Sequence, residues 1–159
     1  MSEARPTTHS EQERIDSILR KLRERGQRVT AQRVAIIRDF VAHRGHPSAE
    51  DIHSELVGQF PMMALSTVYN TLRLLQELGE AVEVSPATTT TRFDPDPDDH
   101  CHLTCLACKT IIDLPVQQGA TAGLMASAIE ALGFEPVRRV DQIFGYCARC
   151  RAAGYSAGS

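Results

Sequence analysis

The apolar residues near the start of the chain recur at the spacing of one face of a helix. Four of them stand at i, i+3, i+4 and i+7, with polar residues between: Ile15, Ile18, Leu19 and Leu22. A stripe of this period is typical of an amphipathic helix whose apolar face is buried. It predicts a helix over residues 11–25, which Gly26 is expected to end.

Start and stop signals frame two further helices. Thr30 is the expected N-cap of the second helix, which should end near Gly45. In "HPSAEDI", Ser48 and Asp51 have the spacing of a capping box, with aspartate where glutamate is commoner. This pair predicts a third helix that ends near Gly58.

A fourth helix and a hairpin complete the first part of the chain. The segment "STVYNTLRLLQELG" predicts a helix that Ser66 caps and Gly79 ends. Residues 81–84 alternate like a strand, and the threonine run before "RFD" has high β-propensity, so the two predict a hairpin. Four helices followed by a hairpin are the plan of a winged helix-turn-helix domain, which we assign to residues 1–92.

The composition changes at "DPDPDD", whose prolines and acidic residues predict an extended hinge at residues 93–99. The pattern beyond it predicts a small α/β domain at residues 100–159. Its expected elements are two strands, a helix and one or two further strands, at 100–107, 110–114, 118–132 and 134–147. The expected fold class is therefore α+β, with two domains joined by a hinge.

The composition is that of a globular protein without a membrane span. Of the 159 residues, 42% are hydrophobic and 23% are charged, and no apolar run has the length needed to cross a bilayer. The N-terminus lacks the apolar segment of a secretory signal. We therefore expect a cytoplasmic protein, in which paired cysteines are more often metal ligands or redox groups than disulfides.

The net charge of −3 gives no general affinity for nucleic acid, but the charge is unevenly distributed. Residues 14–44 hold nine arginines and lysines and three acidic residues, a surplus of six positive charges. This stretch is either a set of solvated helix faces or a basic stripe that contacts phosphates.

The fourth predicted helix carries polar residues away from its apolar stripe. Tyr69 and Arg73 stand four residues apart on such a face. Side chains placed like this reach base edges in a recognition helix, although a solvated helix face has the same pattern. The candidate DNA-binding residues lie on this helix or precede the second one: Ser66, Thr67, Tyr69, Asn70, Arg73 and Arg28.

The five cysteines form two pairs and a remainder. Each pair has the spacing Cys-x-x-Cys, Cys105 with Cys108 and Cys147 with Cys150. Two such pairs complete a tetrahedral thiolate shell suited to Zn²⁺, and a closed shell leaves no position for a catalytic water, so the predicted site is structural. The alternative is a pair of redox-active dithiols. Neither alternative needs the fifth cysteine, Cys101.

Histidines and acidic residues gather around the start of the second predicted domain. His100 and His102 face the same side of a strand, Asp94 precedes them and Asp113 follows on the next strand. Mixed imidazole and carboxylate ligands suit Fe²⁺, Mn²⁺ or Zn²⁺ rather than a metal that selects thiolates. The pattern predicts a second metal site, although ordinary polar residues give the same pattern. His46 precedes the third helix, where a local hydrogen bond accounts for it.

These motifs, in this order, resemble the ferric uptake regulator (Fur) family of bacterial metal-dependent repressors. The resemblance extends from about residue 14 to 151 and rests on six segments, "HPSAEDI", "STVYNTLRLL", "TRFD", "DHCHLTCLAC", "IID" and "GYCARC". It implies a homodimer that is joined through the second domains and binds a double-stranded DNA operator. Within the family, the chain is most similar to the peroxide-responsive branch.

The resemblance also implies a regulatory Fe²⁺ or Mn²⁺ site with ligands from both sides of the hinge: His46, Asp94, His100, His102 and Asp113. Such a metal holds the two domains in the orientation that fits DNA half-sites, and its loss lowers DNA affinity. In the peroxide-responsive branch, peroxide and Fe²⁺ lead to oxidation of a ligating histidine, here His46 or His100. Iron sensors of the family more often have glutamates in place of Asp94 and Asp113.

Two alternatives to a peroxide sensor follow from the sequence. Within the family, the alternative is an iron, manganese or zinc uptake regulator. Outside it, the alternative is a zinc hydrolase or a thiol oxidoreductase, but the chain has no His-Glu-x-x-His motif. Cys101 departs from the family pattern; we expect it to point away from the two histidines, and a sensing thiol is the alternative.

Overall fold

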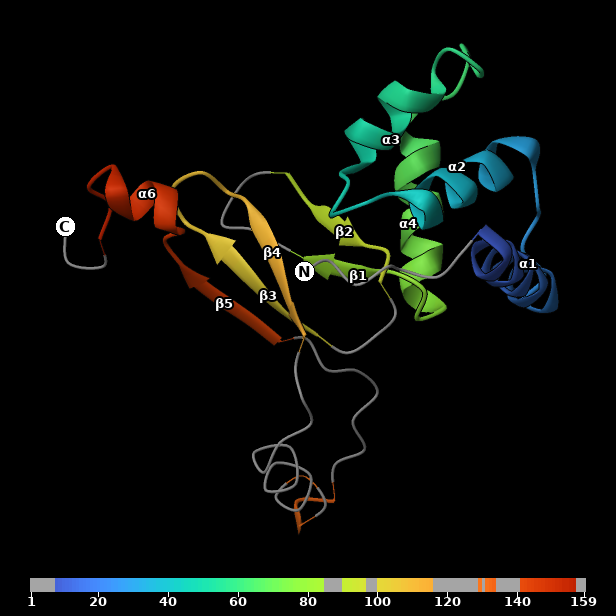
Figure 1. The fold of residues 1–159 in the computed structure, drawn as a ribbon. Coiled ribbons are helices and arrows are strands. Elements are labelled where there is room, and N and C mark those ends of the chain that lie inside the picture. Colours follow the sequence, from blue (N-terminus) through green and yellow to red (C-terminus); the bar gives the residue numbers. More distant parts are fainter. Residues whose placement is uncertain are drawn as a thin grey trace. The chain divides into compact units, whose positions relative to one another are not determined.

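The computed structural model describes residues 8–84, 90–96, 100–115, 129, 131–133 and 141–156. The chain divides into two compact units, Met1–Pro97 and Asp98–Ser159 (Figure 1). Within the described residues, no helix is long and apolar enough to cross a bilayer.

The first unit consists of four helices and a two-stranded sheet (Figure 1). Along the chain, its elements are α1 Thr8–Glu24, α2 Ala31–Ala42, α3 Ala49–Leu56, α4 Leu65–Glu77, β1 Val82–Val84 and β2 Arg92–Asp94. β1 and β2 pair antiparallel, with Glu83 opposite Phe93. This arrangement is the predicted winged-helix plan. β2 reaches into the segment whose composition predicts a hinge, because Phe93 is buried in the core.

The four helices enclose one apolar core. The predicted stripe of α1 is buried, with Ile18 and Leu22 at most 1% exposed. The same buried cluster contains Phe40 of α2 and Leu72 of α4. Replacing a buried leucine or phenylalanine of such a core by alanine typically costs about 2–5 kcal/mol. Apolar packing therefore holds this unit together.

Side chains cap two of the helices as predicted. Thr30 accepts a hydrogen bond from the Arg33 amide at 3.3 Å at the start of α2. At the start of α3, the Ser48 hydroxyl accepts from the Asp51 amide at 3.1 Å, and the Asp51 carboxylate accepts from the Ser48 amide at 2.9 Å. A cap of this kind stabilises a helix by about 1 kcal/mol.

The prediction that Ser66 caps the fourth helix is wrong. α4 begins at Leu65, and its N-cap is Ala64, which makes no side-chain capping bond. Leu65 is half-buried and packs against the core, and this contact favours a helix that already includes Leu65. Ser66 is instead an exposed residue of the first helical turn.

The segment before α3 lies alongside β2. The Phe93 amide donates to the Pro47 carbonyl at 2.9 Å. Nη1 of Arg92 donates to the His46 carbonyl at 2.7 Å. These bonds hold the His46 segment beside the strand that ends at Asp94.

The second unit contains a three-stranded sheet and a short helix (Figure 1). Its elements are β3 His100–Cys105, β4 Ile111–Pro115, β5 Asp141–Gly145 and α6 Ala148–Ala152. The central strand β3 is antiparallel to β4 and parallel to β5. A parallel neighbour requires a crossover connection between the two strands. The helix predicted at 118–132 falls mostly outside the described residues, of which Ile129 and Ala131 are helical.

A pair of carboxyl groups joins α2 to α3 beside a histidine. Burial raises the pKa of Asp39 to about 6, and the charge of Glu55 and a hydrogen bond with it add to the shift. The charge of His43 acts to lower the pKa of Asp39, and His43 Nε2 lies 3.6 Å from Glu55 Oε1. Because the folded-state pKa exceeds the ordinary value of 3.8, this group stabilises the fold at low pH and loses that contribution as the pH rises through about 6.

We predict that Asp39→Asn stabilises the protein near neutral pH. The expected gain is at most about 1 kcal/mol at about pH 7, because solvent screens this half-exposed side chain, and it should shrink towards pH 4. Urea unfolding of both proteins at about pH 7 and pH 4.5 measures it. Asp16→Asn, which changes an exposed carboxylate of α1, is the control. An equal gain at both pH values would contradict the proposed ionisation.

Candidate metal centres

Four thiols converge at one end of the three-stranded sheet. Cys105 ends β3, Cys108 follows in the turn, Cys147 is the N-cap of α6 and Cys150 lies within that helix. Their sulfur atoms all lie within 4.8 Å of one another. The Sγ atoms of Cys108 and Cys147 are 3.7 Å apart, close to the edge of about 3.8 Å that Zn–S bonds of about 2.3 Å give in a tetrahedron. The predicted cluster is formed, and its shape fits zinc.

The turn after β3 presents the first two thiols. Lys109 has a φ of 63°, in the left-handed region, and its amide donates to the Cys105 carbonyl at 2.9 Å. The Cys147 amide donates to Cys105 Sγ at 3.4 Å. Backbone N–H groups that point at sulfur favour the thiolate over the thiol. The Cys147 amide at the start of α6 therefore favours an anionic Cys105, which can act as a ligand for a cation.

Two of the four thiols, Cys108 and Cys150, have pKa values shifted in opposite directions. Hydrogen bonds with the Thr110 hydroxyl and amide lower the pKa of Cys108 to about 5. Burial raises the pKa of Cys150 to about 12. A divalent cation among the four sulfurs favours the thiolate form of each, so metal binding would release protons.

Two histidines and an aspartate meet across β3 and β4. His102 lies directly opposite Asp113 in the antiparallel register. The Nε2 atoms of His100 and His102 are 3.0 Å apart, and Asp113 Oδ1 lies 3.6 Å and 4.0 Å from them. Two nitrogens bound at about 2.1 Å and at a right angle on one ion are also about 3.0 Å apart. This donor set fits a borderline or hard ion such as Fe²⁺, Mn²⁺ or Zn²⁺.

The two remaining predicted ligands belong to the first unit. His46 is 9% exposed and Asp94 is 2% exposed. Asp94 Oδ1 accepts a hydrogen bond from the Asp96 amide at 2.8 Å. Since the His46 segment lies alongside β2, the first unit presents an imidazole and a carboxylate on adjoining segments.

Cys101 lies between the two histidines in sequence and belongs to the other face of β3. Successive side chains of a strand point to opposite sides, and Cys101 pairs with Leu114 on β4 and Asp141 on β5. It is 5% exposed. Among the residues that the structure describes, it joins neither group of converging ligands.

Helix α4 turns an apolar face to the core and a polar face outward. Val68 and Leu72 have no exposed surface. The exposed candidates for DNA contact are Ser66, Asn70, Arg73 and Arg28. Thr67 and Tyr69 are half-buried, and the Tyr69 hydroxyl donates to Glu50 of α3 at 2.9 Å. The sequence pattern did not identify Glu50 as the hydrogen-bond partner of Tyr69.

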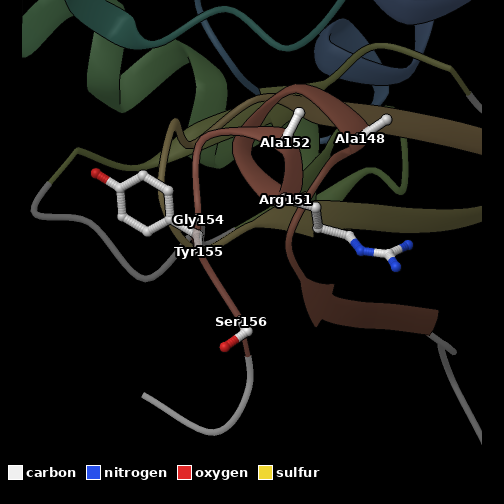
Figure 2. Close-up of a pocket in the computed structure, with 6 residues that line it drawn as sticks. All are labelled: Ala148, Arg151, Ala152, Gly154, Tyr155 and Ser156. Atoms are coloured by element: carbon white, nitrogen blue, oxygen red, sulfur yellow. The ribbon is translucent and has the colours of Figure 1, made fainter.

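An open pocket lies beside α6 and the segment that follows it (Figure 2). Its lining residues are Ala148, Arg151, Ala152, Gly154, Tyr155 and Ser156. The Arg151 side chain and the Tyr155 ring point away from each other in Figure 2. No predicted ligand lines this pocket, so it belongs to neither candidate metal centre.

The profile of the ferric uptake regulator family matches residues 24–136, which is most of the chain. The chain belongs to this family. Membership confirms the resemblance that the motifs predict. It makes the protein a metal-responsive regulator of the ferric uptake regulator family, whose members are transcriptional regulators.

Relatives within the family are similar over nearly their whole length. The peroxide operon regulator of Bacillus subtilis is 36% identical over 136 residues, 86% of this chain and 92% of that protein. The structure of the peroxide-sensing regulator PerR from Streptococcus pyogenes is 31% identical, with a TM-score of 0.50, and covers 86% of this chain and 92% of that chain. The Helicobacter pylori ferric uptake regulator has a TM-score of 0.69 at 18% identity, covers 86% of this chain and 93% of that chain, and shows the fold alone.

We predict that Cys150→Ser removes the zinc of the thiol cluster. After a chelator wash that clears weaker sites, the zinc content should fall from about one ion per chain to nearly none, because a closed site needs all four ligands. Elemental analysis measures this, and Cys101→Ser, which keeps the four converging sulfurs, is the control. Zinc retained by Cys150→Ser, or lost from the control, would contradict the ligand assignment.

Proposed function

We propose that this protein is a homodimeric, metal-dependent DNA-binding repressor that senses peroxide. The observation that carries the proposal is the divided donor set. Three nitrogen and oxygen donors meet in the second unit, whereas His46 and Asp94 belong to the unit that contains helix α4. Identity of 36% with a peroxide operon regulator supports the sensing role. We assign DNA binding to residues 1–92, a hinge to 93–99, and metal binding and dimerisation to 100–159.

In this proposal, one Fe²⁺ or Mn²⁺ takes ligands from both sides of the hinge: His46, Asp94, His100, His102 and Asp113. All five ligands reach a single ion in only one arrangement of the two domains, so metal binding selects that arrangement. If DNA requires the same arrangement, then metal and DNA each raise the affinity for the other by linkage. Repression is thereby tied to the metal.

The proposed DNA contact is made by helix α4. Arg73 and Asn70 are exposed on it, as a helix lying in the major groove requires. The bond from Tyr69 to Glu50 restricts the tyrosine ring, which gives it a defined direction. Arg28 is exposed before α2 and would contact phosphate, which fits the basic surplus of residues 14–44.

A dimer through the second domain is supported by apolar side chains on the sheet. Ile112 of β4 and Ile143 of β5 lie opposite Leu103 of β3 in the register, on one face. They are 49% and 57% exposed. Apolar residues grouped on an exposed face are typical of an interface. A two-fold dimer would present two copies of α4 to two half-sites on the DNA.

Peroxide sensing would use the ligands themselves. Fe²⁺ held by these ligands would supply the redox chemistry that cleaves the O–O bond of hydrogen peroxide, which Mn²⁺ would do far less readily. We expect one oxygen of hydrogen peroxide to be inserted into a ring C–H bond of His46 or His100 as the O–O bond breaks, and the other oxygen to leave as water. An oxidised ring is a weaker donor, so the site loses affinity for its metal, the hinge is released and the DNA is freed.

An iron, manganese or zinc uptake regulator without peroxide sensing is the alternative function. The donor set supports it equally, because imidazole and carboxylate ligands suit these metals alike. In that case the same hinge would respond to metal concentration alone, and the histidines would survive exposure to peroxide.

We predict that His46→Ala abolishes metal-dependent DNA binding and leaves the zinc of the thiol cluster in place. The affinity for DNA should fall about tenfold or more, because the metal loses the imidazole that the first domain contributes. Fluorescence anisotropy measures it with a duplex selected from a randomised pool by the Mn²⁺-loaded wild type. His43→Ala, three residues away beside Glu55, is the control. Unchanged binding by His46→Ala would exclude bridging by this residue.

We also predict that peroxide adds one oxygen atom to His46 or His100 in the Fe²⁺-loaded protein and to neither in the Mn²⁺-loaded protein. Tandem mass spectrometry of the peptides locates the oxygen. His53, whose Nε2 lies 2.8 Å from the Met63 carbonyl oxygen, serves as the internal control. If neither predicted histidine is modified, the uptake-regulator alternative is correct.

A further inference from the structure

We propose that Arg14 is a positioning residue that fixes the start of the hinge and so directs Asp94 towards the regulatory metal. The inference rests on the proposed function in one respect, the role of Asp94 as a ligand. Arg14 lies on α1, and its side chain is 17% exposed. Nothing in its spacing along the helix distinguishes it from the other arginines of that helix.

The guanidinium of Arg14 joins three parts of the first unit. Nη1 donates to the carbonyl of Pro95. Nη2 donates to the carbonyl of Glu80 at 2.9 Å, and Nε lies 3.4 Å from the Glu80 carboxylate. A planar guanidinium offers its donors in a rigid fork, so these contacts set the direction of the Pro95 carbonyl relative to both α1 and Glu80.

The contact acts next to a proposed ligand. Pro95 follows Asp94 directly, and the proline ring restricts φ at this position. On the other side, the Asp94 carboxylate accepts the Asp96 amide at 2.8 Å. Two hydrogen bonds therefore hold the segment 94–96. Arg14 binds the Pro95 carbonyl, and the Asp94 carboxylate binds the Asp96 amide. Loss of the bond between Arg14 and Pro95 would leave the backbone next to Asp94 less restricted.

The second partner of Arg14, Glu80, lies close to the proposed recognition helix α4. Glu80 is 11% exposed and follows the C-terminus of α4. Lys21 of α1 lies 2.6 Å from its other carboxylate oxygen, so two cations hold one carboxylate in place. Through Arg14, the first residue after Asp94 is positioned relative to the end of α4. Arg14 thus contacts both the residue after the proposed ligand Asp94 and the residue Glu80 near the end of the proposed recognition helix.

Arg14 is not required to hold α1 in the fold. Ile18 and Leu22 of the same helix are at most 1% exposed in the apolar core. Ile15, next to Arg14, is 6% exposed. Because these apolar contacts fix the helix, replacing Arg14 should leave α1 packed. The change should remove only the contact that holds Pro95 at the start of the hinge.

The test compares Arg14→Met with Arg14→Lys and with Arg20→Met. Lysine keeps the charge near Glu80 but lacks the fork that reaches both carbonyls. Arg20 lies on the same helix with a 69% exposed side chain and faces Glu24, so it is the matched control. Each protein is assayed for hydrogen exchange in a peptide that contains the Asp96 amide, without regulatory metal. Mn²⁺ affinity is then measured by electron paramagnetic resonance, with zinc content and the thermal midpoint as folding controls.

Arg14→Met should speed exchange of the Asp96 amide and weaken Mn²⁺ binding by about 10- to 100-fold, as for other residues that orient a ligand. Arg14→Lys should fall between it and the wild type, and Arg20→Met should match the wild type. Unchanged exchange, or Mn²⁺ affinity within about twofold of the wild type, would overturn the proposal.

An Asp94→Asn variant separates this inference from the proposed function. If it binds Mn²⁺ as tightly as the wild type, Asp94 is not a ligand, and both the ligand set and the role of Arg14 in metal binding are overturned. If it binds weakly while Arg14→Met binds normally, the ligand set stands and only the role of Arg14 is overturned.

Discussion

The convergence of four thiols is the constraint on which the second unit depends. Among its described residues, the buried side chains are Cys101, Cys105, Cys150, His102 and Thr104, and no leucine, isoleucine, valine or phenylalanine is buried. The described part of this unit therefore draws little stability from apolar packing, and a structural metal supplies stability in many small domains. Bringing the end of β3 to the start of α6 also holds β5 beside β3, because β5 leads directly into that helix. The sheet and the cluster are thus mutually dependent.

The first unit is stabilised in the opposite way. Its helices share one apolar core, and its polar contacts lie at the margin, where Arg14 and Lys21 surround Glu80. A core of this kind does not respond to metal, so the loss of a regulatory ion leaves the DNA-binding fold intact. In the proposed function, the ion would therefore control how the DNA-binding domain is oriented and not whether it folds. On this proposal, the chain would keep the zinc of the thiol cluster while the regulatory metal is bound and released.

Local patterns predicted the features that depend on local physics. The stripe from Ile15 to Leu22 and the capping box at Ser48 are both present, since helix periodicity and caps involve neighbouring residues. The bond from Arg14 to Pro95 joins residues 81 positions apart, and no periodicity reports such a pair. The start of α4 was predicted wrongly because a hydroxyl residue was taken as the cap, whereas the helix already includes Leu65, which packs against the core. Helix α6 has five residues, too few to show a period, and follows from the geometry of the second Cys-x-x-Cys pair.

The position of Cys101 shows how a strand can keep two kinds of metal chemistry apart. His100 and His102 share one face of β3, and Cys101 occupies the other because successive side chains alternate. For its sulfur to join the imidazoles, β3 would have to shift by one residue, which would turn both histidines away and break the pairing of His102 with Asp113. The thiolates of the other four cysteines favour a soft or borderline ion, and the imidazole and carboxylate donors favour a harder one. A fifth thiol on the histidine face would remove that distinction, so its burial on the far face preserves the chemical identity of the second site.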